Sequence, residues 1–345
     1  MSEQHLALYR KYRPQTFSDV VGQEHLVTLL ESSIKQKKIS HAYLFCGGRG
    51  TGKTTVARIF AHDIGCNPED IIEIDAASNR GIDEIRELRD AVRTAPFSSQ
   101  YKVYIVDEAH MLTKEAANAL LKTLEEPPSH VIFILATTDQ EKLPATIVSR
   151  CQKVEFKSPD METLSKRIKN IAEREGNKSF DIETAKIIAS QANGSFRDAL
   201  GRLESFLIVG KTDLSPTNAK EVFGTPDSEL IVSLIKSICE KDSHKIATMA
   251  GELEKNNRFA LTQYDYLLNS IRCALLIRVG AMELVSKSQS SHQDELGKLA
   301  KDYPLVIGSK LILQLLEKRH LLEVSESHAW TAFLAVMLST AEPAS

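Results

Sequence analysis

Between residues 42 and 156, short apolar runs alternate with segments in which apolar residues recur every three or four positions. The runs at 42–46, 71–75, 102–107, 131–138 and 153–156 have the length and composition of buried strands. The segments between them have the periodicity of helices that pack one face on a sheet. Alternating strands and helices predict an α/β fold, a parallel sheet with helices on both faces and ligands at the carboxyl ends of its strands.

Helix boundaries in this part follow from capping residues and proline. An amphipathic pattern predicts a helix from about Glu24 to Lys37, and a stripe of apolar residues predicts another over 82–93. Thr113 is a good N-cap residue, and the helix that it begins should end at Pro127 and Pro128.

The strand pattern stops after residue 156, and the rest of the chain is helical in pattern. Ser158 followed by Pro159 predicts a helix N-terminus, and two more short helices should begin at Asp181 and Ser195. Residues 224–227 have the composition of a hinge, and long leucine- and isoleucine-rich helices follow. The expected organisation is an α/β domain at 1–157, a three-helix lid at 158–224 and an all-α domain at 225–345.

Composition limits the possible function classes. The chain has 345 residues, of which 42% are hydrophobic and 26% are charged, as in a globular protein of two or three domains. A net charge of −3 gives no overall attraction to nucleic acid, so any DNA contact must come from a local basic face. The sequence shows no signal peptide and no apolar run of about 20 residues, so we expect a cytoplasmic protein without membrane contact. Its five cysteines form no C-x-x-C pair, which favours reduced thiols.

The strongest chemical signal is the sequence GGRGTGKT, which begins at Gly47 between a predicted strand and a predicted helix. Its glycines let successive backbone N–H groups face inward, and the following helix adds the positive end of its dipole, so the loop suits a polyphosphate. Lys53 is expected to contact the β- and γ-phosphates, and the Thr54 hydroxyl to ligate Mg²⁺.

A pair of carboxylates, Asp107 and Glu108, ends the strand at 102–107, which we expect to lie beside the strand that leads into the glycine-rich loop. Asp107 suits the Mg²⁺ shell, and Glu108 suits the activation of water. With Ala109 and His110, the pair also spells a helicase motif. A helicase of that type needs a second α/β domain, which the helical remainder of the chain does not predict.

Several polar residues are open to two interpretations. Thr137 and Thr138 could bind the attacking water or the γ-phosphate, or be ordinary residues at a strand end. Arg150, in Ser149-Arg150-Cys151, could neutralise a transferring phosphoryl group in a neighbouring subunit, and Arg197 could do so within its own subunit. Either arginine could instead be a surface salt-bridge partner. Residues 5–25, basic and aromatic and then turning at Pro14, could be an exposed arm or part of a pocket for a nucleotide base.

Four segments together resemble one known family. GGRGTGKTT, VYIVDEAHMLTKEAANALLKTLEEPP, ATTDQEKLPATIVSRC and GSFRDAL are similar to the gamma/tau (DnaX) ATPase subunits of bacterial DNA polymerase III clamp loaders, which are AAA+ proteins. The resemblance covers about residues 5–225. It implies an AAA+ domain with a helical lid, followed by a helical collar that forms oligomers. It also implies an ATP hydrolase that loads a sliding clamp onto primed DNA during replication.

The resemblance implies a role for individual residues. The implied ATP-binding residues are Tyr9, Arg13, Pro14, Val20, Val21, Gly47, Gly48, Arg49, Gly50, Thr51, Gly52, Lys53, Thr54 and Thr55. Thr54 and Asp107 would hold Mg²⁺, Glu108 would activate water, and Thr138 would be the first sensor. Arg150 would act as a finger on the neighbour's ATP, and Arg197 as the second sensor. Asn79, Arg80, Thr113 and Lys114 would face duplex DNA and contact its phosphates.

The implied partners are delta- and delta-prime-type subunits, copies of the chain itself, the sliding clamp and primed DNA. Family members usually carry a four-cysteine zinc module, but here Cys66 leads directly into the strand at 71–75, and one thiol cannot close such a site, so we expect no zinc. A related subunit that does not hydrolyse ATP is disfavoured by Lys53, Thr54 and Glu108. An assembly scaffold with structural nucleotide stays open, as does the choice between a natural short form and a truncated chain.

Overall fold

The computed structural model describes residues 6–78, 91–209, 213–223, 228–256, 259–285, 292–323 and 326–341. The chain divides into two compact units, Met1–Ser215 and Pro216–Ser345. Most of the helix expected at 82–93, and the expected DNA contacts Asn79 and Arg80, lie outside the described residues. The finer domain boundaries expected after residues 157 and 224 stay predictions.

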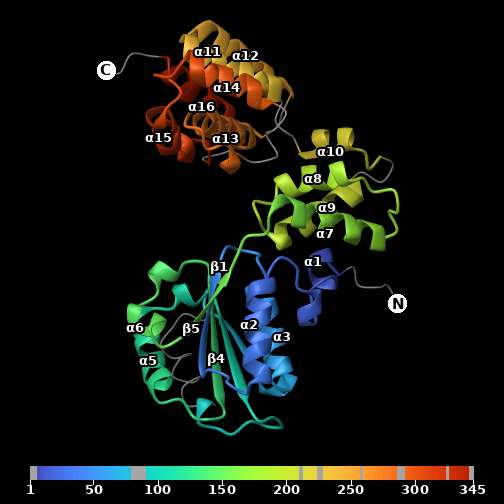
Figure 1. Cartoon of the computed structure of the whole chain (residues 1–345), viewed down its shortest axis with the longest axis vertical. Helices are drawn as coiled ribbons and strands as arrows, with labels where there is room; N and C mark the ends of the chain where they lie inside the picture. Colours follow the sequence, from blue (N-terminus) through green and yellow to red (C-terminus); the bar gives the residue numbers. More distant parts are fainter. Residues whose placement is uncertain are drawn as a thin grey trace. The chain divides into compact units, whose positions relative to one another are not determined.

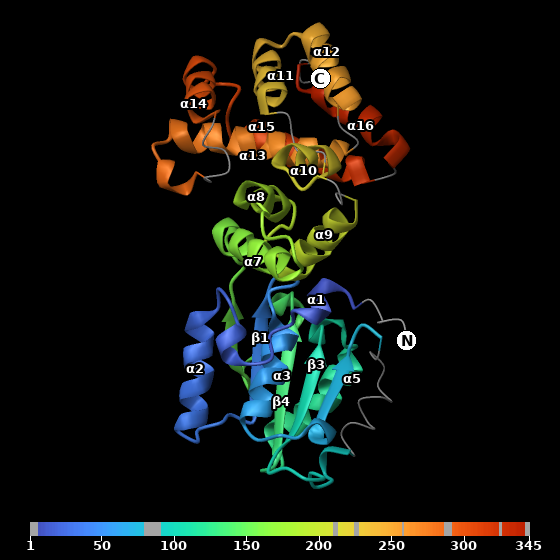
Figure 2. The ribbon, with the colours of Figure 1, turned by 90° about the vertical axis from the view of Figure 1, so that its right-hand side faces the viewer.

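The first unit contains the predicted parallel sheet. Its strands are β1 (Ala42–Gly47), β2 (Ile71–Asp75), β3 (Lys102–Asp107), β4 (Val131–Thr137) and β5 (Gln152–Phe156). They pair in the order β2-β3-β4-β1-β5, with every pair parallel (Figure 2). The expectation that β3 lies beside β1 was wrong, because β4 lies between them. A helical crossover can skip a strand position, so strand order does not follow from the order of elements in the chain.

Helices cover both faces of this sheet, as the alternation of side chains along a strand requires. Helices α2 (Glu24–Lys35) and α3 (Lys53–Asp63) lie on one face, and α5 (Lys114–Glu125) and α6 (Ala145–Val148) lie on the other (Figure 1). In β1, Tyr43 and Phe45 pack in the core with α2 and α3, whereas Leu44 and Cys46 pack in the core with α5 and α6. The central strands β1, β3 and β4 are buried on both faces, so a ligand can reach them only at their ends.

Three helices beyond β5 complete the first unit, as expected for a lid. They are α7 (Met161–Arg174), α8 (Ile182–Ser190) and α9 (Phe196–Val209). The expected start of α7 at Ser158 was wrong: Asp160 is its N-cap, and its carboxylate accepts a hydrogen bond from the Thr163 N–H at 2.7 Å. An aspartate that can satisfy a free N–H of the first turn therefore outweighed the preference of proline for the first helical position.

The short N-terminal helix α1 (Leu8–Lys11) packs on α9 of the lid. The backbone N–H of Leu8 donates to a Glu204 carboxylate oxygen at 3.3 Å, and the Arg167 guanidinium donates to the Tyr12 carbonyl at 3.0 Å. The Tyr12 hydroxyl also donates to Glu175 at 2.5 Å. The N-terminal segment is therefore joined to the lid at several points.

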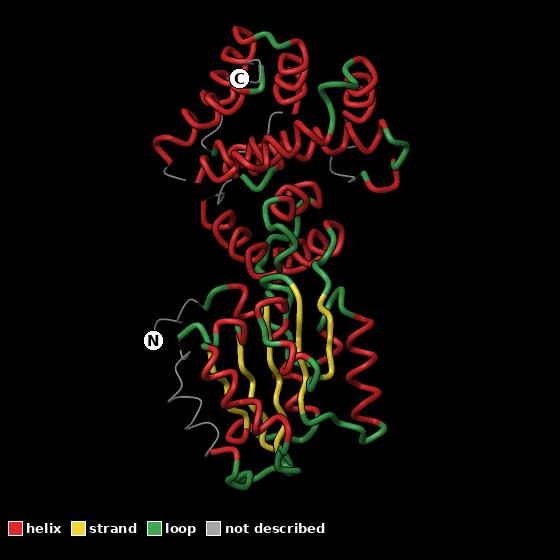
Figure 3. The backbone as a smooth tube through the Cα atoms, turned by 90° about the vertical axis from the view of Figure 1, so that its left-hand side faces the viewer, coloured by secondary structure: helices red, strands yellow, loops and turns green. Residues whose placement is uncertain are grey.

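The second unit is all α within its described residues (Figure 3). Its helices are α10 (Pro216–Phe223), α11 (Ser228–Glu240), α12 (Ser243–Asn256), α13 (Ala260–Arg278), α14 (Gln293–Asp302), α15 (Ser309–Lys318) and α16 (Glu326–Ser339). Helices α11 to α16 share one apolar core, in which Tyr264 of α13 is buried and donates its hydroxyl to the Leu315 carbonyl at 2.6 Å. Among the helices that the structure describes, none is long and apolar enough to cross a bilayer.

Candidate functional site

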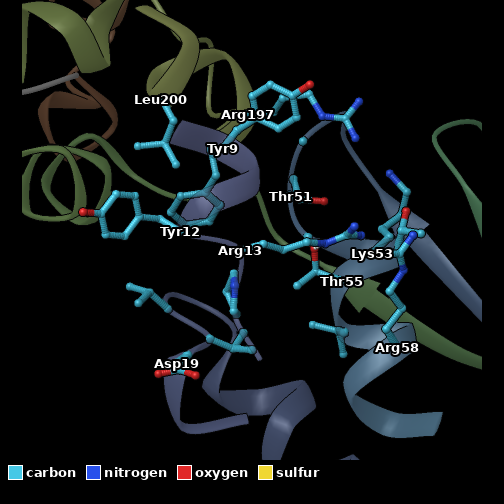
Figure 4. A pocket seen from close by; sticks show the side chains of 18 of the residues that line it. Tyr9, Tyr12, Arg13, Asp19, Thr51, Lys53, Thr55, Arg58, Arg197 and Leu200 are labelled. Carbon is cyan, nitrogen blue, oxygen red and sulfur yellow. Dashed lines mark hydrogen bonds between the residues drawn. The ribbon is translucent and has the colours of Figure 1, made fainter. Parts of the chain in front are cut away.

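A pocket of about 910 Å³ opens in the first unit between the N-terminal segment, the glycine-rich loop, the end of β3 and the lid. Figure 4 shows the side chains of Lys53 and Arg58 from α3, Tyr9 and Arg13 from the N-terminal segment and Arg197 from the lid around this opening. The predicted residues that line it are Tyr9, Arg13, Pro14, Val20, Val21, Arg49, Gly50, Thr51, Gly52, Lys53, Thr54, Thr55, Asp107, Glu108 and Arg197. Most of the predicted nucleotide site therefore lies in one pocket.

Three glycines of the loop have backbone conformations that other residues rarely adopt. Gly47, with φ +155°, ends β1 so close to β5 that a Cβ would lie 2.5 Å from the Phe156 carbonyl oxygen. Gly50, with φ +70°, lies against the lid, and its carbonyl accepts from the Phe196 N–H at 3.0 Å. Gly52, with φ +103°, has open space where a Cβ would be, and it is the N-cap of α3. The loop is thus fixed by its neighbours at Gly47 and Gly50.

Lys53 extends back along the inside of the loop. Its ammonium group donates to the Gly47 carbonyl at 2.8 Å and to the Gly48 carbonyl at 2.9 Å, and the residue is 6% exposed. Burial lowers the pKa of Lys53, while the carboxylates of Glu108 and Asp107 oppose that shift. A buried ammonium group whose hydrogen-bond partners are neutral carbonyl groups is a favourable site for an anion.

The loop meets the end of β3 through one short hydrogen bond. The Thr54 hydroxyl donates to Oδ2 of Asp107 at 2.7 Å, although β4 separates β3 from β1. The contact forms because α3, which begins at Lys53, packs across β1, β4 and β3. A hydroxyl and a carboxylate oxygen side by side are hard ligands of the kind that suits Mg²⁺, which usually takes few protein ligands and keeps its waters.

Glu108 follows Asp107 in an unusual conformation. Its φ of 48° and ψ of 44° are left-handed, which costs a non-glycine residue roughly 1 kcal/mol or more. The Asp107 carboxylate accepts from the Glu108 N–H at 3.0 Å, and the Thr138 hydroxyl donates to Oε2 of Glu108 at 3.2 Å. The turn therefore directs the Glu108 side chain toward the end of β4.

The N-terminal segment supplies an aromatic and cationic wall. The Arg13 guanidinium donates to the Thr55 hydroxyl at 3.0 Å, and burial lowers the pKa of Arg13, helped by the nearby Arg58 cation. The cations of Arg10 and Arg197 lie 5.8 and 5.9 Å from the centre of the Tyr9 ring. Of the two interpretations of residues 5–25, the structure favours part of a pocket over an exposed arm.

Sequence reasoning missed part of the pocket lining. The additional residues are Arg10, Tyr12, Gln15, Asp19, Val56, Arg58, Arg167, Phe196 and Leu200. The helical spacing of Arg58, four residues after Thr54 and three after Thr55, could have indicated it. Nothing local indicates that Arg167 of the lid reaches this place. With these residues, seven cationic side chains and three carboxylates line the pocket, although the whole chain is acidic. Such a balance favours a polyanion.

Other predicted residues lie outside the lining of the pocket. Gly48 and Gly47 form the back of the loop, and Thr138 lies exposed at the end of β4. Arg150 follows α6, and its guanidinium is paired with Glu125 of α5 at 2.6 Å. Thr113 and Lys114 are exposed at the start of α5, where the Thr113 hydroxyl accepts from the Ala116 N–H at 3.2 Å.

The cysteine side chains of the described part are not joined to one another. Cys66 is buried, and its thiol contacts the carbonyl oxygens of Tyr101 at 3.2 Å and Asp70 at 3.4 Å. Burial raises its pKa. In the parts of the chain that the structure describes, no three His, Cys, Asp or Glu side chains are grouped closely enough to hold a metal ion. The expected lack of zinc stays a prediction.

Comparisons with known proteins agree on one group of relatives. The chain is 46% identical over 270 residues to DNA polymerase III subunit tau of Bacillus subtilis, an alignment that covers 72% of this chain and 47% of that protein. It is 40% identical to subunit tau of Escherichia coli, over 73% of this chain and 42% of that protein. It is also 40% identical to subunit gamma of Buchnera aphidicola subsp. Schizaphis graminum, over 72% of this chain and 74% of that protein. The chain thus spans about half the length of the tau relatives and most of the gamma relative.

A family model and a solved structure also resemble parts of the chain. Residues 22–79 and 68–160 match the model of the DNA polymerase III delta subunit. The Holliday junction branch migration motor RuvB of Thermotoga maritima has a similar fold, with a TM-score of 0.52 and 22% identity, over 66% of this chain and 80% of that one. This likeness supports the predicted α/β fold with its parallel sheet.

Proposed function

The chain belongs to the gamma/tau subunit family of DNA polymerase III, and from this premise we propose that it is an ATP-hydrolysing motor of the replicative clamp loader. In this proposal, ATP binding and hydrolysis drive the loading of a sliding clamp onto primed DNA. The observation that carries it is the hydrogen bond from Thr54 to Asp107, at 2.7 Å, beneath a pocket rich in cations. It joins the phosphate-binding loop to the carboxylates that hydrolysis requires.

Different residues of the pocket would bind the phosphates and the base of the nucleotide. The N–H groups of the loop and the Lys53 ammonium group hold the phosphates, and the aromatic wall at Tyr9 and Tyr12 with Val20 and Val21 accommodates the base. Lys53 is buried and surrounded by carbonyl groups, so an anionic phosphate is a better partner for it than the Gly47 and Gly48 carbonyls.

Hydrolysis requires a water molecule that is oriented and deprotonated. Glu108 accepts the proton of that water. Thr138 donates a hydrogen bond to the Glu108 carboxylate and so fixes the orientation of that carboxylate. Thr54 and Asp107 would hold Mg²⁺, which when bound neutralises charge on the β- and γ-phosphate oxygens. Arg197, from the lid, lines the same pocket and can neutralise charge that develops on the transferring group.

The proposal places Arg150 in a neighbour's site. Arg150 does not line the pocket of its own chain, which supports a role for its guanidinium on the ATP of another subunit. We infer an assembly of this chain with copies of itself and with delta- and delta-prime-type subunits, held together by the helical second unit as a collar. Primed DNA would be bound through its phosphates, in part by Thr113 and Lys114, in the cytoplasm.

Two substitutions test the proposal in the assembly reconstituted with clamp and primed DNA. Lys53→Ala should abolish ATP binding, because it removes charge that acts on the bound phosphates. Glu108→Gln should leave binding intact and stop hydrolysis, because the amide cannot accept the proton of water. Binding is measured with a fluorescent ATP analogue, and turnover by phosphate release.

The same measurements separate the motor from an assembly scaffold. A motor hydrolyses ATP faster when clamp and primed DNA are added, whereas a scaffold with structural nucleotide binds ATP and shows no stimulated turnover. Equal ATP affinity for Lys53→Ala and the parent chain would contradict the assigned site.

A further inference from the structure

His110 connects the two strand ends that carry Glu108 and Thr138. It lies in the 3₁₀ helix Ala109–Met111 directly after Glu108, and its side chain is 11% exposed. Nδ1 of its ring lies 3.0 Å from the hydroxyl oxygen of Thr137 and 3.5 Å from Oε2 of Glu108. One ring nitrogen therefore faces both the last residue of β4 and the carboxylate that the proposed function assigns to proton abstraction.

The hydrogen bonds of Thr137 determine which partner donates to which. Thr137 is fully buried, and its hydroxyl donates to the Asp139 carbonyl at 3.0 Å and accepts from the Asp139 N–H at 3.0 Å. A hydroxyl has one hydrogen to donate, so Thr137 accepts from His110. Nδ1 of His110 consequently carries a proton. The Glu108 carboxylate favours the same arrangement, because a lone pair on Nδ1 would repel it.

Two polar groups lie beside one carboxylate oxygen of Glu108. Its Oε2 accepts from the Thr138 hydroxyl at 3.2 Å and faces the Nδ1–H group of His110 at 3.5 Å. The left-handed backbone of Glu108 is a costly conformation that its surroundings must maintain. His110 is the residue that joins this strained turn to the buried end of β4.

We propose that His110 is a positioning residue for ATP hydrolysis: its Nδ1–H group, anchored on Thr137, holds the carboxylate of Glu108 in the orientation that activates water. The proposal rests on the proposed function and adds a role to a residue that touches neither phosphate nor metal in it. It also explains the histidine of the Asp107-Glu108-Ala109-His110 sequence without requiring a helicase activity.

Two substitutions differ only in where they place a donor. In His110→Asn the amide nitrogen takes the position of Nδ1, whereas in His110→Gln it takes that of Nε2. We expect His110→Gln to lower the stimulated kcat of the reconstituted assembly about 10-fold to 100-fold, less than the loss of the general base itself. We expect His110→Asn to stay within about threefold of the parent, and the Kd for ATP to change little in both.

A histidine elsewhere in the chain serves as the control for the His110 variants. His130→Asn changes a partly exposed imidazole elsewhere in the sheet domain and should leave turnover unchanged. Equal kcat for the Asn and Gln variants, or a loss that appears in Kd or in unfolding midpoints alone, would overturn the proposal. If the parent assembly itself hydrolyses no ATP, the proposed function fails and this inference fails with it. If the parent hydrolyses ATP and His110→Gln has the same kcat, the role of His110 is wrong while the proposed function stands.

A second readout does not depend on turnover. Nitrogen-15 spectra of the histidine rings distinguish Nδ1–H from Nε2–H, and the His110 signal is assigned by its loss in His110→Asn. We expect the Nδ1–H form in the parent chain. Detection of the Nε2–H form would remove the donor on which the proposal depends.

Discussion

The guanidinium of Arg150 is held in place by Glu125, whose Oε1 lies 2.6 Å from Nη2, while Nη1 donates to the Thr146 carbonyl at 2.7 Å. Both groups are partly exposed, with 33% of the Arg150 and 49% of the Glu125 side chain accessible. The arginine proposed to act on a neighbour's ATP therefore has a defined orientation within its own chain.

Arg150→Ala should leave ATP binding unchanged and lower clamp- and DNA-stimulated turnover on the order of 10³-fold, because the charge that it neutralises develops only in the transition state. Mixing this variant with Lys53→Ala subunits should restore part of the activity, since one interface then combines an intact Lys53 with an intact Arg150. Phosphate release from the mixed assemblies measures this recovery. Full stimulated turnover of Arg150→Ala alone would show an ordinary surface ion pair.

Glu125→Gln tests whether the pair with Arg150 orients the finger. An exposed ion pair contributes at most about 1 kcal/mol, so stimulated turnover should fall by no more than about fivefold, with the Kd for ATP unchanged. The neighbouring Glu126→Gln is the matched control and should behave as the parent chain does. A loss of the same size in both variants would assign the effect to the net charge of this surface.

Gly50→Ala should weaken ATP binding roughly tenfold or more. The new Cβ would lie 2.1 Å from the Ser195 hydroxyl oxygen, so the lid must shift away from the loop. Gly65→Ala is the control: its φ of +85° gives similar backbone strain with no atom within 4 Å, so it should cost about 1 kcal/mol of stability and leave binding unchanged.

Adding Ser195→Gly to Gly50→Ala removes the two nearest clashing atoms and should recover part of the affinity. Titration with a fluorescent ATP analogue measures all four chains. Parent-like affinity of Gly50→Ala would show that the contact between lid and loop is irrelevant to binding.

Asp70→Asn should lower the free energy of unfolding by about 2 kcal/mol at pH 7. Asp70 is 1% exposed, and its carboxylate accepts from the N–H groups of Phe97 at 2.6 Å and of Ser98 and Ser99 at 2.9 Å. In the Asn variant, the side-chain NH₂ group takes the place of one carboxylate oxygen. It then faces a backbone N–H group, so a buried donor is left without an acceptor. Urea unfolding of this variant, with the exposed Asp63→Asn as control, measures the loss.

The loss caused by Asp70→Asn should depend on pH. Burial raises the pKa of Asp70, but the hydrogen bonds from Ser98, Phe97 and Ser99 together outweigh burial, and the pKa is lowered. A carboxyl with a lowered folded-state pKa stabilises the fold above its unfolded-state pKa near 4, and this contribution disappears as the pH falls through the folded-state value. The difference between parent and variant should therefore narrow between pH 4 and more acidic conditions. A constant difference would contradict this assignment.

The strands and helices were predicted from local sequence patterns. The apolar runs and the glycine-rich loop identified β1, β3 and the start of α3 closely, because burial on both faces and a loop–helix junction leave direct traces in sequence. The position of β4 between β3 and β1 could not be predicted, since pairing order depends on crossovers and not on local composition.

The candidate site was predicted as far as its motifs extend. Lys53, Thr54 and Asp107 lie in recognisable patterns, whereas Arg167 and Leu200 enter the pocket from the lid, and only tertiary packing brings them there. The link from His110 to Thr137 is of the same kind: both residues were visible in the sequence, but their contact depends on the pairing of β3 with β4.

Two walls of the pocket are attached to different parts of the first unit. Leu8 and Tyr12 are bonded to the lid residues Glu204, Arg167 and Glu175, while the phosphate loop continues from the sheet through Gly47. The phosphate loop also touches the lid, because the Gly50 carbonyl accepts from the Phe196 N–H at 3.0 Å. The lid is therefore bonded both to the wall proposed for the base and to the loop proposed for the phosphates, so a displacement of the lid would act on both ends of a bound nucleotide.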